Sequence, residues 1–116
     1  MSNERIYKMK FSTIYPLYVQ KIERKGRNIT ELNEVILWLA GYDDKGLTEQ
    51  IEKDATFEVF FEEAPQINAN VDKITGVICG IRVEEIADPL VQKVRWLDKL
   101  VDELAKGKSM EKILRA

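Results

Sequence analysis

Apolar residues recur at helical spacing along most of the chain. The clearest stripe has the i, i+3, i+4, i+7 spacing of a core-facing helix and consists of Leu32, Val35, Ile36 and Leu39. Asn28 and Glu31 stand at the spacing of a capping box, with Thr30 as a competing cap, and Gly41 ends the stripe. Because further apolar residues widen this face, we expect the helix between residues 28 and 41 to be central.

A second stripe predicts a helix over residues 13–25. Ile14, Tyr18 and Ile22 recur at four-residue spacing, and Ser12 or Thr13 can cap the start. We therefore expect the proline at position 16 to fall in the first helical turn, where a missing backbone N–H costs little. The glycine at position 26 is placed to end the helix in a left-handed conformation.

The last third of the chain predicts a long helix over residues 89–106. Asp88 is a good N-cap, Pro89 suits the first helical position, and Gly107 ends the run. Apolar residues alternate spacings of four and three along one seam, which consists of Leu90, Val94, Leu97, Val101 and Leu104. Ser109 is placed to cap a final short turn that carries Met110, Ile113 and Leu114 on its inner side.

Two shorter helices are expected in the middle of the chain. Residues 43–46 are typical of a turn, and residues 47–53 of a short helix with Leu47 and Ile51 inward. Thr56 is placed to cap a second helix that Pro65 closes. Three of the four phenylalanines, Phe57, Phe60 and Phe61, lie in this second helix. We interpret them as an aromatic core plug, with a ring-lined ligand pocket as the alternative.

The segment 71–86 fits two structures. Val71, Ile74 and Ile78 fit helical spacing, while the alternation from Val77 to Val83 fits a strand equally well. We favour a helix here. The sequence therefore predicts a mainly α protein, a compact single-domain helical bundle of about five to seven helices over residues 1–116. The alternative is an α+β fold with a short strand pair around 74–83.

Composition limits the catalytic and metal-binding mechanisms that the chain can use. The chain has 116 residues, a formal net charge of −2, one cysteine and no histidine. Without an imidazole, Ser-His and Cys-His nucleophiles and His-ligated zinc are excluded. A single cysteine cannot form an internal disulfide, and no uncharged stretch approaches the ~20 residues of a membrane span. We expect a cytoplasmic protein without a membrane segment.

Few side chains suggest a reactive or metal-binding site. The apolar neighbours of Cys79 predict a buried, inert thiol, with a reactive thiol as the alternative. Asp98 and Asp102 share a helix face and offer oxygens to a divalent cation. Since Arg95 and Lys99 lie between them, ion pairing explains the pattern without a metal. We assign no catalytic residue, cofactor or metal ligand.

Basic residues gather in two clusters. One ends the helix over 13–25 and the other ends the chain; they consist of Lys21, Arg24, Lys25 and Arg27, and of Lys106, Lys108, Lys112 and Arg115. Cations are favourable near helix C-termini, which explains both clusters by themselves. If the two clusters meet in the fold, they form an anion-binding patch. Because the net charge is slightly negative, a nucleic-acid partner is disfavoured.

Seven sequence motifs resemble the bacterial domain-of-unknown-function family 2200. They are Tyr15-Pro16-Leu17-Tyr18, residues 21–27, Trp38-Leu39-Ala40-Gly41-Tyr42, Phe60-Phe61 with Ala64-Pro65, residues 74–80, residues 82–86 and residues 97–108. The resemblance covers essentially the whole chain and departs at Ala69, where the family has proline. It implies a small, mainly helical, single-domain bacterial protein, and it transfers no catalytic residues because the family has no established activity.

Three functional hypotheses remain. The first, which we favour, is a non-enzymatic binding or interaction module. It rests on the seam of the helix over 89–106, through which a homodimer can form with Trp38 and Trp96 as interface anchors. The alternative, which we favour for the seam itself, is that these residues belong to the protein's own core. The second is a small-molecule-binding protein or an enzyme built on tyrosine, arginine and carboxylate groups. Its candidate functional surface consists of Tyr15, Tyr18, Arg82, Glu84 and Glu85. The third is weak nucleic-acid association through the basic clusters.

Overall fold

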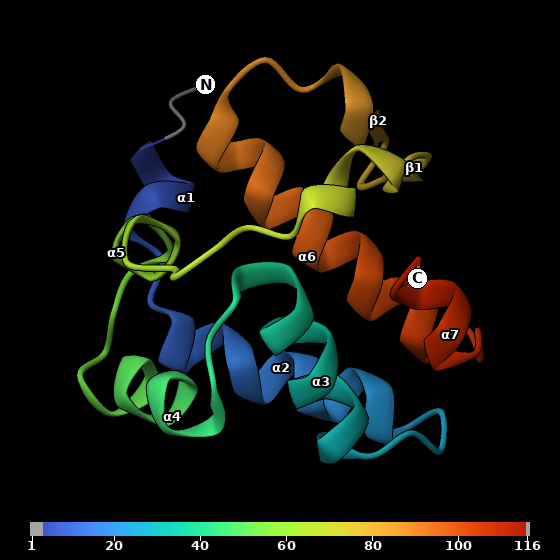
Figure 1. Ribbon diagram of the computed structural model, residues 1–116, viewed down its shortest axis with the longest axis horizontal. Coiled ribbons are helices and arrows are strands. Elements are labelled where there is room, and N and C mark those ends of the chain that lie inside the picture. The colour runs from blue at the N-terminus through green and yellow to red at the C-terminus, as the bar shows by residue number, and fades with distance from the viewer. Residues whose placement is uncertain (1–3, 116) are drawn as a thin grey trace.

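Helices make up most of the molecule. The computed structural model describes residues 4–115 (Figure 1). Its seven α-helices are α1 (Glu4–Lys8), α2 (Phe11–Glu23), α3 (Ile29–Ala40), α4 (Asp44–Glu52), α5 (Phe57–Glu62), α6 (Pro89–Ala105) and α7 (Met110–Ile113). Between α5 and α6 lie the 3-10 helix η1 (Ala69–Lys73), strands β1 (Val77–Ile78) and β2 (Ile81–Arg82), and the 3-10 helix η2 (Val83–Glu85). The mainly α prediction and its helix number are confirmed.

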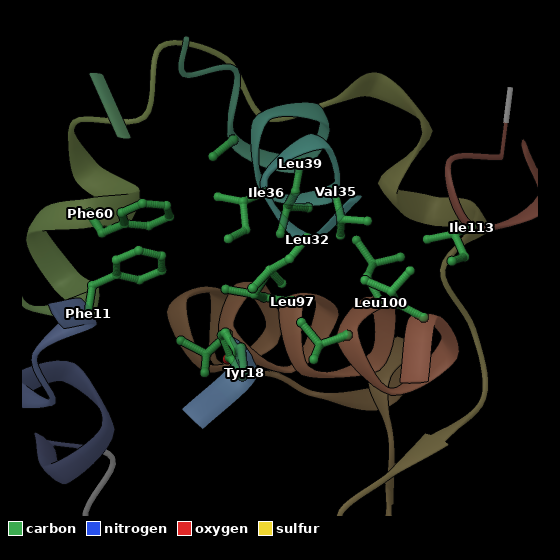
Figure 2. Packing of buried hydrophobic residues seen from close by; sticks show 14 of the residues in the cluster. Phe11, Tyr18, Leu32, Val35, Ile36, Leu39, Phe60, Leu97, Leu100 and Ile113 are labelled. Atoms are coloured by element: carbon green, nitrogen blue, oxygen red, sulfur yellow. The ribbon is translucent and has the colours of Figure 1, made fainter. Parts of the chain in front are cut away.

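Helices α2, α3 and α6 pack against one another around the core. Figure 2 shows the stripe of α3, with Leu32, Val35 and Ile36, facing Leu97 and Leu100 of α6. All five of these side chains are fully or almost fully inaccessible to solvent. Burial of each such side chain stabilises the fold by roughly 1.5–3 kcal/mol. The expectation that α3 is central is confirmed.

Capping hydrogen bonds confirm most of the predicted helix N-termini. The Asn28 side chain accepts from the N–H of Glu31, whose carboxylate accepts from the N–H of Asn28, so the capping box is complete. Thr56, Asp88 and Ser109 cap α5, α6 and α7 through their side-chain oxygens. Each cap satisfies an amide that has no partner within its own helix. Local sequence is therefore sufficient to start these four helices.

Helix α2 begins two residues before the predicted position, and Pro16 lies inside it rather than in its first turn. The cause is a contact that is distant in sequence. Lys10 and Thr56 form an antiparallel bridge, and the N–H of Phe11 donates to the carbonyl of Ala55 at 2.8 Å. Since this pairing fixes the chain just before Phe11, the helix starts there without a side-chain cap.

Helix α4 also begins earlier than predicted. Asp43 is its N-cap and accepts from the N–H of Gly46 at 2.7 Å, so the expected turn over 43–46 is the first turn of the helix. Leu47 is buried and Ile51 is partly buried, as the periodicity predicts. The helix therefore presents the expected face to the core, with its start shifted by three residues.

The phenylalanines form the predicted aromatic core plug. Phe57, Phe60 and Phe61 are buried, and Phe60 stacks on Phe11 with ring centroids 4.2 Å apart. Figure 2 shows these two stacked rings at one end of the core. The Tyr42 hydroxyl donates to the carbonyl of Phe60. The rings thus fasten α5 to the start of α2, and of the three, Phe61 also lines a pocket, of about 330 Å³, between α5 and the start of α6.

The seam of α6 belongs to the protein's own core. Val94, Leu97, Val101 and Leu104 are buried, and Leu90 is partly buried. A second copy therefore cannot reach these seam residues unless the fold opens. Within residues 4–115, no helix combines the length and the apolar character that crossing a lipid bilayer requires.

The prediction of a helix over 71–86 is wrong, and the alternative of a strand pair is right. Strands β1 and β2 are antiparallel, with Val77 opposite Arg82 and Ile78 opposite Ile81. Cys79 and Gly80 both have positive φ, at 54° and 77°, which is the pattern of a type I′ hairpin turn. A helix cannot contain two consecutive left-handed residues. The β-branched residues follow their strand preference instead.

Gly41, at the end of α3, stands where the surrounding backbone leaves no room for a side chain. Gly41 has a φ of 80°, and the carbonyls of Leu39 and Ala40 accept from the N–H groups of Asn68 and Gln66. This segment lies so close that a Cβ on Gly41 would stand 2.6 Å from the Gln66 carbonyl oxygen. Any side chain at position 41 would therefore displace the chain that covers the end of α3.

We expect Gly41→Ala to destabilise the protein clearly more than Gly26→Ala. Gly26 has the same φ of 80° with no atom within 4 Å of an added Cβ, so it isolates the backbone cost. That cost is about 1–2 kcal/mol, and the clash adds at least about 2 kcal/mol at position 41. Urea denaturation of both variants measures the difference. Equal losses would show that the Gln66 contact imposes no constraint.

Candidate functional site

The five residues of the predicted functional surface do not converge. Tyr15 faces α3, where its hydroxyl donates to the Asn33 side chain, whereas Tyr18 is buried against α6. Arg82 and Glu84 pair at 3.0 Å on the exposed hairpin side of the molecule. Glu85 is exposed beside them. The two tyrosines of the predicted surface thus lie apart from its three charged residues. Within residues 4–115, no hydrogen bond or ion pair joins either tyrosine directly to one of those three.

Arg95 connects Tyr18 indirectly to the hairpin. The Tyr18 hydroxyl donates to Asp98 Oδ1 at 2.6 Å, and Arg95 Nη1 donates to Asp98 Oδ2 at 2.9 Å. The same guanidinium nitrogen lies 3.5 Å from Cys79 Sγ. Burial, and then the negative charge of Asp98, hold the pKa of Tyr18 well above its usual range. This chain of contacts reaches from the core to the hairpin tip.

The prediction that Cys79 is buried is wrong. The thiol is exposed at the tip of the hairpin. Its apolar neighbours Val77 and Ile81 are themselves 53% and 46% exposed. An apolar local sequence indicates burial only when another element covers it, and here α6 contacts the hairpin without covering its tip.

Hydrogen-bond donors nearby in the sequence hold the carboxylate of Glu84. Glu84 accepts from the N–H of Gly76 and from Arg82, both at 3.0 Å. Its pKa is lowered by hydrogen bonds from its own backbone N–H and that of Gly76, with a smaller contribution from Arg82. These contacts stabilise the turn into η2, and they explain Glu84 without a ligand.

The two basic clusters meet at the ends of α2 and α6. Lys21 and Lys106 both pair with Asp102, at 3.3 and 3.0 Å. Arg27 donates to the carbonyl oxygens of Leu104 and Lys108, at 3.3 and 2.8 Å. The condition for an anion-binding patch, contact between the clusters, is therefore fulfilled.

Ion pairing accounts for the acidic face of α6. Asp98 pairs with Arg95, and Asp102 with Lys21 and Lys106. Burial acts to raise the pKa of Asp102, but the hydrogen bonds from the two lysines lower it on balance. In the described part of the chain, no three Cys, Asp or Glu side chains are placed to hold a metal ion.

Sequence reasoning missed the ion pair of Glu103. This carboxylate is 5% exposed, and Arg115 binds it through both terminal nitrogens at 3.0 and 2.8 Å. The signal in the sequence is that Glu103 lies between Val101 and Leu104 on a helix with a buried seam. A buried carboxylate needs such a partner, since an unpaired charge there costs several kcal/mol.

A large pocket lies over the outer face of α3. It has a volume of about 850 Å³, and its lining includes Tyr15, Glu34, Leu37, Trp38, Asp44 and Ile51. We call it the α3 groove. Leu114, just after α7, lines it as well. Among the described lining residues, Glu34 and Asp44 supply the carboxylates and none is a lysine or arginine; both carboxylates are exposed. Burial raises the pKa of Tyr15 against the opposing effect of its bond to Asn33, so its phenol stays neutral.

The α3 groove contains one residue of the predicted surface, Tyr15, and one predicted interface anchor, Trp38. Sequence reasoning assigned Trp38 to the apolar face of a central helix, and it did not place α4 beside it. The available signal was that Leu37 and Trp38 fall outside the buried stripe of α3.

Comparison with known proteins identifies the family. The model of the family described as "Uncharacterized protein conserved in bacteria (DUF2200)" matches residues 5–115. The chain belongs to the DUF2200 family. A solved structure, "Crystal structure of uncharacterized protein SP1917", is 43% identical with a TM-score of 0.91, and the match covers 99% of this chain and 93% of that one. No curated protein matches the chain.

These comparisons confirm the resemblance and assign no activity. The DUF2200 family and the SP1917 structure carry descriptions without a substrate, partner or reaction. The function of this DUF2200 protein is unknown from its relatives.

We expect Tyr18→Phe to change the alkaline stability of this DUF2200 protein. A raised folded pKa contributes stability that is complete below about pH 10 and is lost as pH rises through the folded value. The variant loses about 1.5–3 kcal/mol at pH 7 with the bond to Asp98. Above pH 10, the free energy of unfolding of the variant should fall with pH less steeply than that of the native protein. The two slopes should differ by about 1.4 kcal/mol per pH unit.

Urea denaturation from pH 7 to 11.5 measures both effects. Tyr7, Tyr15 and Tyr42 are present in both proteins, so their contributions cancel in the comparison. Parallel stability curves above pH 10 would contradict the assigned environment of Tyr18.

We also expect the native protein to react with one equivalent of a thiol reagent such as dithionitrobenzoate. The exposed Cys79 should react within roughly tenfold of its rate in urea, because no unfolding is needed to reach it. Cys79→Ser serves as the blank, since the chain has a single cysteine. Labelling that waits for global unfolding would contradict the exposed position.

Proposed function

We propose that this DUF2200 protein is a non-enzymatic binding module and that the α3 groove is the surface it uses. The observation that carries the proposal is the lining of that groove, in which Trp38 and Tyr15 lie beside two exposed carboxylates. Its volume of about 850 Å³ is in the upper part of the range of ligand sites. Aromatic side chains with a polar rim are typical of interaction surfaces.

The charge of the groove indicates the partner. Glu34 and Asp44 are negative, and none of the lining residues is a lysine or arginine. Leu37, Trp38 and Ile51 supply an apolar floor. A cationic amphipathic helix offers both an apolar stripe and positive charges, and it binds in grooves of this kind. Such a segment is the partner that we propose.

The length of the groove fits such a segment. Its α3 residues run from Thr30 to Trp38, a rise of roughly 12 Å at ~1.5 Å per residue. Two to three turns of a partner helix would cover that distance. Leu114 at the edge gives the partner a further apolar contact.

An enzyme is less well supported. Its proposed groups, Tyr15, Tyr18 and Arg82, lie in separate environments, and the Tyr18 hydroxyl is already bonded to Asp98 in the core.

The domain organisation and the cellular location of the module are also proposals. One hydrophobic cluster includes residues from α2 to α7, which supports a single domain over 1–116. One exposed thiol without a second cysteine supports a reducing, cytoplasmic location.

We expect an 18-residue helical peptide made of leucine and lysine, with leucine on one face, to bind the α3 groove. Fluorescence anisotropy of the labelled peptide measures the affinity. Trp38→Ala should weaken binding at least about tenfold, because a central aromatic anchor contributes 1.4 kcal/mol or more. Glu34→Lys should weaken it as well through charge repulsion. Since Glu34 is exposed, that variant keeps its fold.

Glu85→Lys is the matched control. It changes the net charge as Glu34→Lys does, and it lies on the exposed hairpin side. It should leave the affinity within about twofold. A peptide of leucine and glutamate should not bind. Equal weakening by Glu34→Lys and Glu85→Lys would overturn the proposal, because attraction to the overall charge would then explain binding.

A further inference from the structure

A second pocket lies at the junction of α6 and α7, apart from the α3 groove. It has a volume of about 570 Å³, and its lining includes Lys99, Asp102, Glu103, Lys106, Lys108 and Lys112. We call it the basic pocket. The α6 residues are spaced i, i+3, i+4, i+7 and therefore lie on one stripe of the helix, with the loop and α7 forming the opposite wall.

The two carboxylates of the basic pocket pair with cations both inside and outside it, and the cation closest to Asp102 is Lys106 of the pocket, at 3.0 Å. Lys21 of α2 pairs with Asp102 at 3.3 Å. Arg115 binds Glu103 at 2.8 Å, while Lys108 is farther away at 3.7 Å. Neither Lys21 nor Arg115 lines the pocket. With Lys21 and Arg115 added to the four pocket lysines, the described residues place more cations than carboxylates here, so the charge around the pocket is positive on balance.

The end of α6 does not by itself explain these lysines. Cations gather at helix C-termini because the last carbonyls are partly negative. Here Arg27 of α2 already donates to the carbonyl of Leu104. Lys99 lies almost two turns before the helix end, and Lys112 belongs to α7. Among the described residues, no carboxylate pairs with Lys99 or Lys112. Lys99 Nζ donates to the neutral carbonyl of Val77 at 3.4 Å, and no described carboxylate neutralises the charge of either lysine.

The lining also shows what kind of anion fits. It contains no aromatic or branched apolar side chain, so it offers no surface for a base or an acyl chain. The pocket is far larger than a single phosphate needs. Lysine is a common phosphate binder that acts as a point charge. Recognition must therefore rest on several negative charges in a row.

We propose that the basic pocket binds a run of phosphate groups, with Lys99, Lys106, Lys108 and Lys112 as the binding residues. The run has two chemical sources, an inorganic oligophosphate and the backbone of a single-stranded nucleic acid. Both present consecutive phosphates, and neither needs base recognition here. The proposal is independent of the α3 groove.

Binding of a fluorescein-labelled twelve-residue oligothymidylate, measured by anisotropy at several salt concentrations, tests this proposal. Four lysine–phosphate contacts predict a slope of about −2.8 for log affinity against log salt, which is a loss of about 50-fold between 50 and 200 mM. Lys106→Gln with Lys112→Gln should reduce the slope to about −1.4. Both residues are accessible and have no buried contact, so the fold is kept.

Lys8→Gln with Lys45→Gln is the matched control, since both lysines are exposed and outside the basic pocket. The control should keep the original slope. Displacement of the label by tripolyphosphate would show that any phosphate chain is accepted, and displacement by unlabelled oligonucleotide alone would identify the nucleic-acid backbone as the source. No binding at 50 mM salt, or the same slope in both double variants, would overturn the proposal.

Discussion

The packing of α2, α3 and α6 against one another is the interaction on which the rest of the structure depends. Ile22, Leu32 and Leu97, one from each helix, are fully buried. Because α6 covers the core face of α3, the outer face of α3 is left for α4 and the α3 groove. Because α6 also runs beside α2, the basic ends of both helices come together at Asp102. Both candidate binding surfaces thus follow from one arrangement of three helices.

Sequence patterns were sufficient where the determinants are local. Asn28 with Glu31, Thr56 and Asp88 start their helices by bonds to amides two or three residues away, and such spacing is visible in a sequence. The start of α2 is different, since the bridge between Lys10 and Thr56 joins segments 46 residues apart. The hairpin was uncertain because β-branched residues satisfy both periods, and only the left-handed turn at positions 79 and 80 decides between them.

The candidate site was less predictable than the fold. The sequence shows that Tyr15 and Trp38 flank helical stripes, but their common groove requires the position of α4. The pair between Glu103 and Arg115 joins the long helix to the chain's last turn. Arg82 and Glu84, two members of the predicted functional surface, are explained by local hydrogen bonds at the hairpin. Burial of Cys79 failed as a prediction because burial is decided by neighbours distant in the sequence.

The position of α6 after α2 and α3 in the sequence has a consequence for the order of folding. The contacts between Tyr18 and Asp98 and between Lys21 and Asp102 join residues 80 and 81 positions apart. Proteins rich in such distant contacts fold more slowly than helical proteins with local contacts. On the ribosome, the apolar stripe of α3 has to wait until α6 emerges before it is covered. During that interval this small helical protein exposes the hydrophobic surface that chaperones recognise.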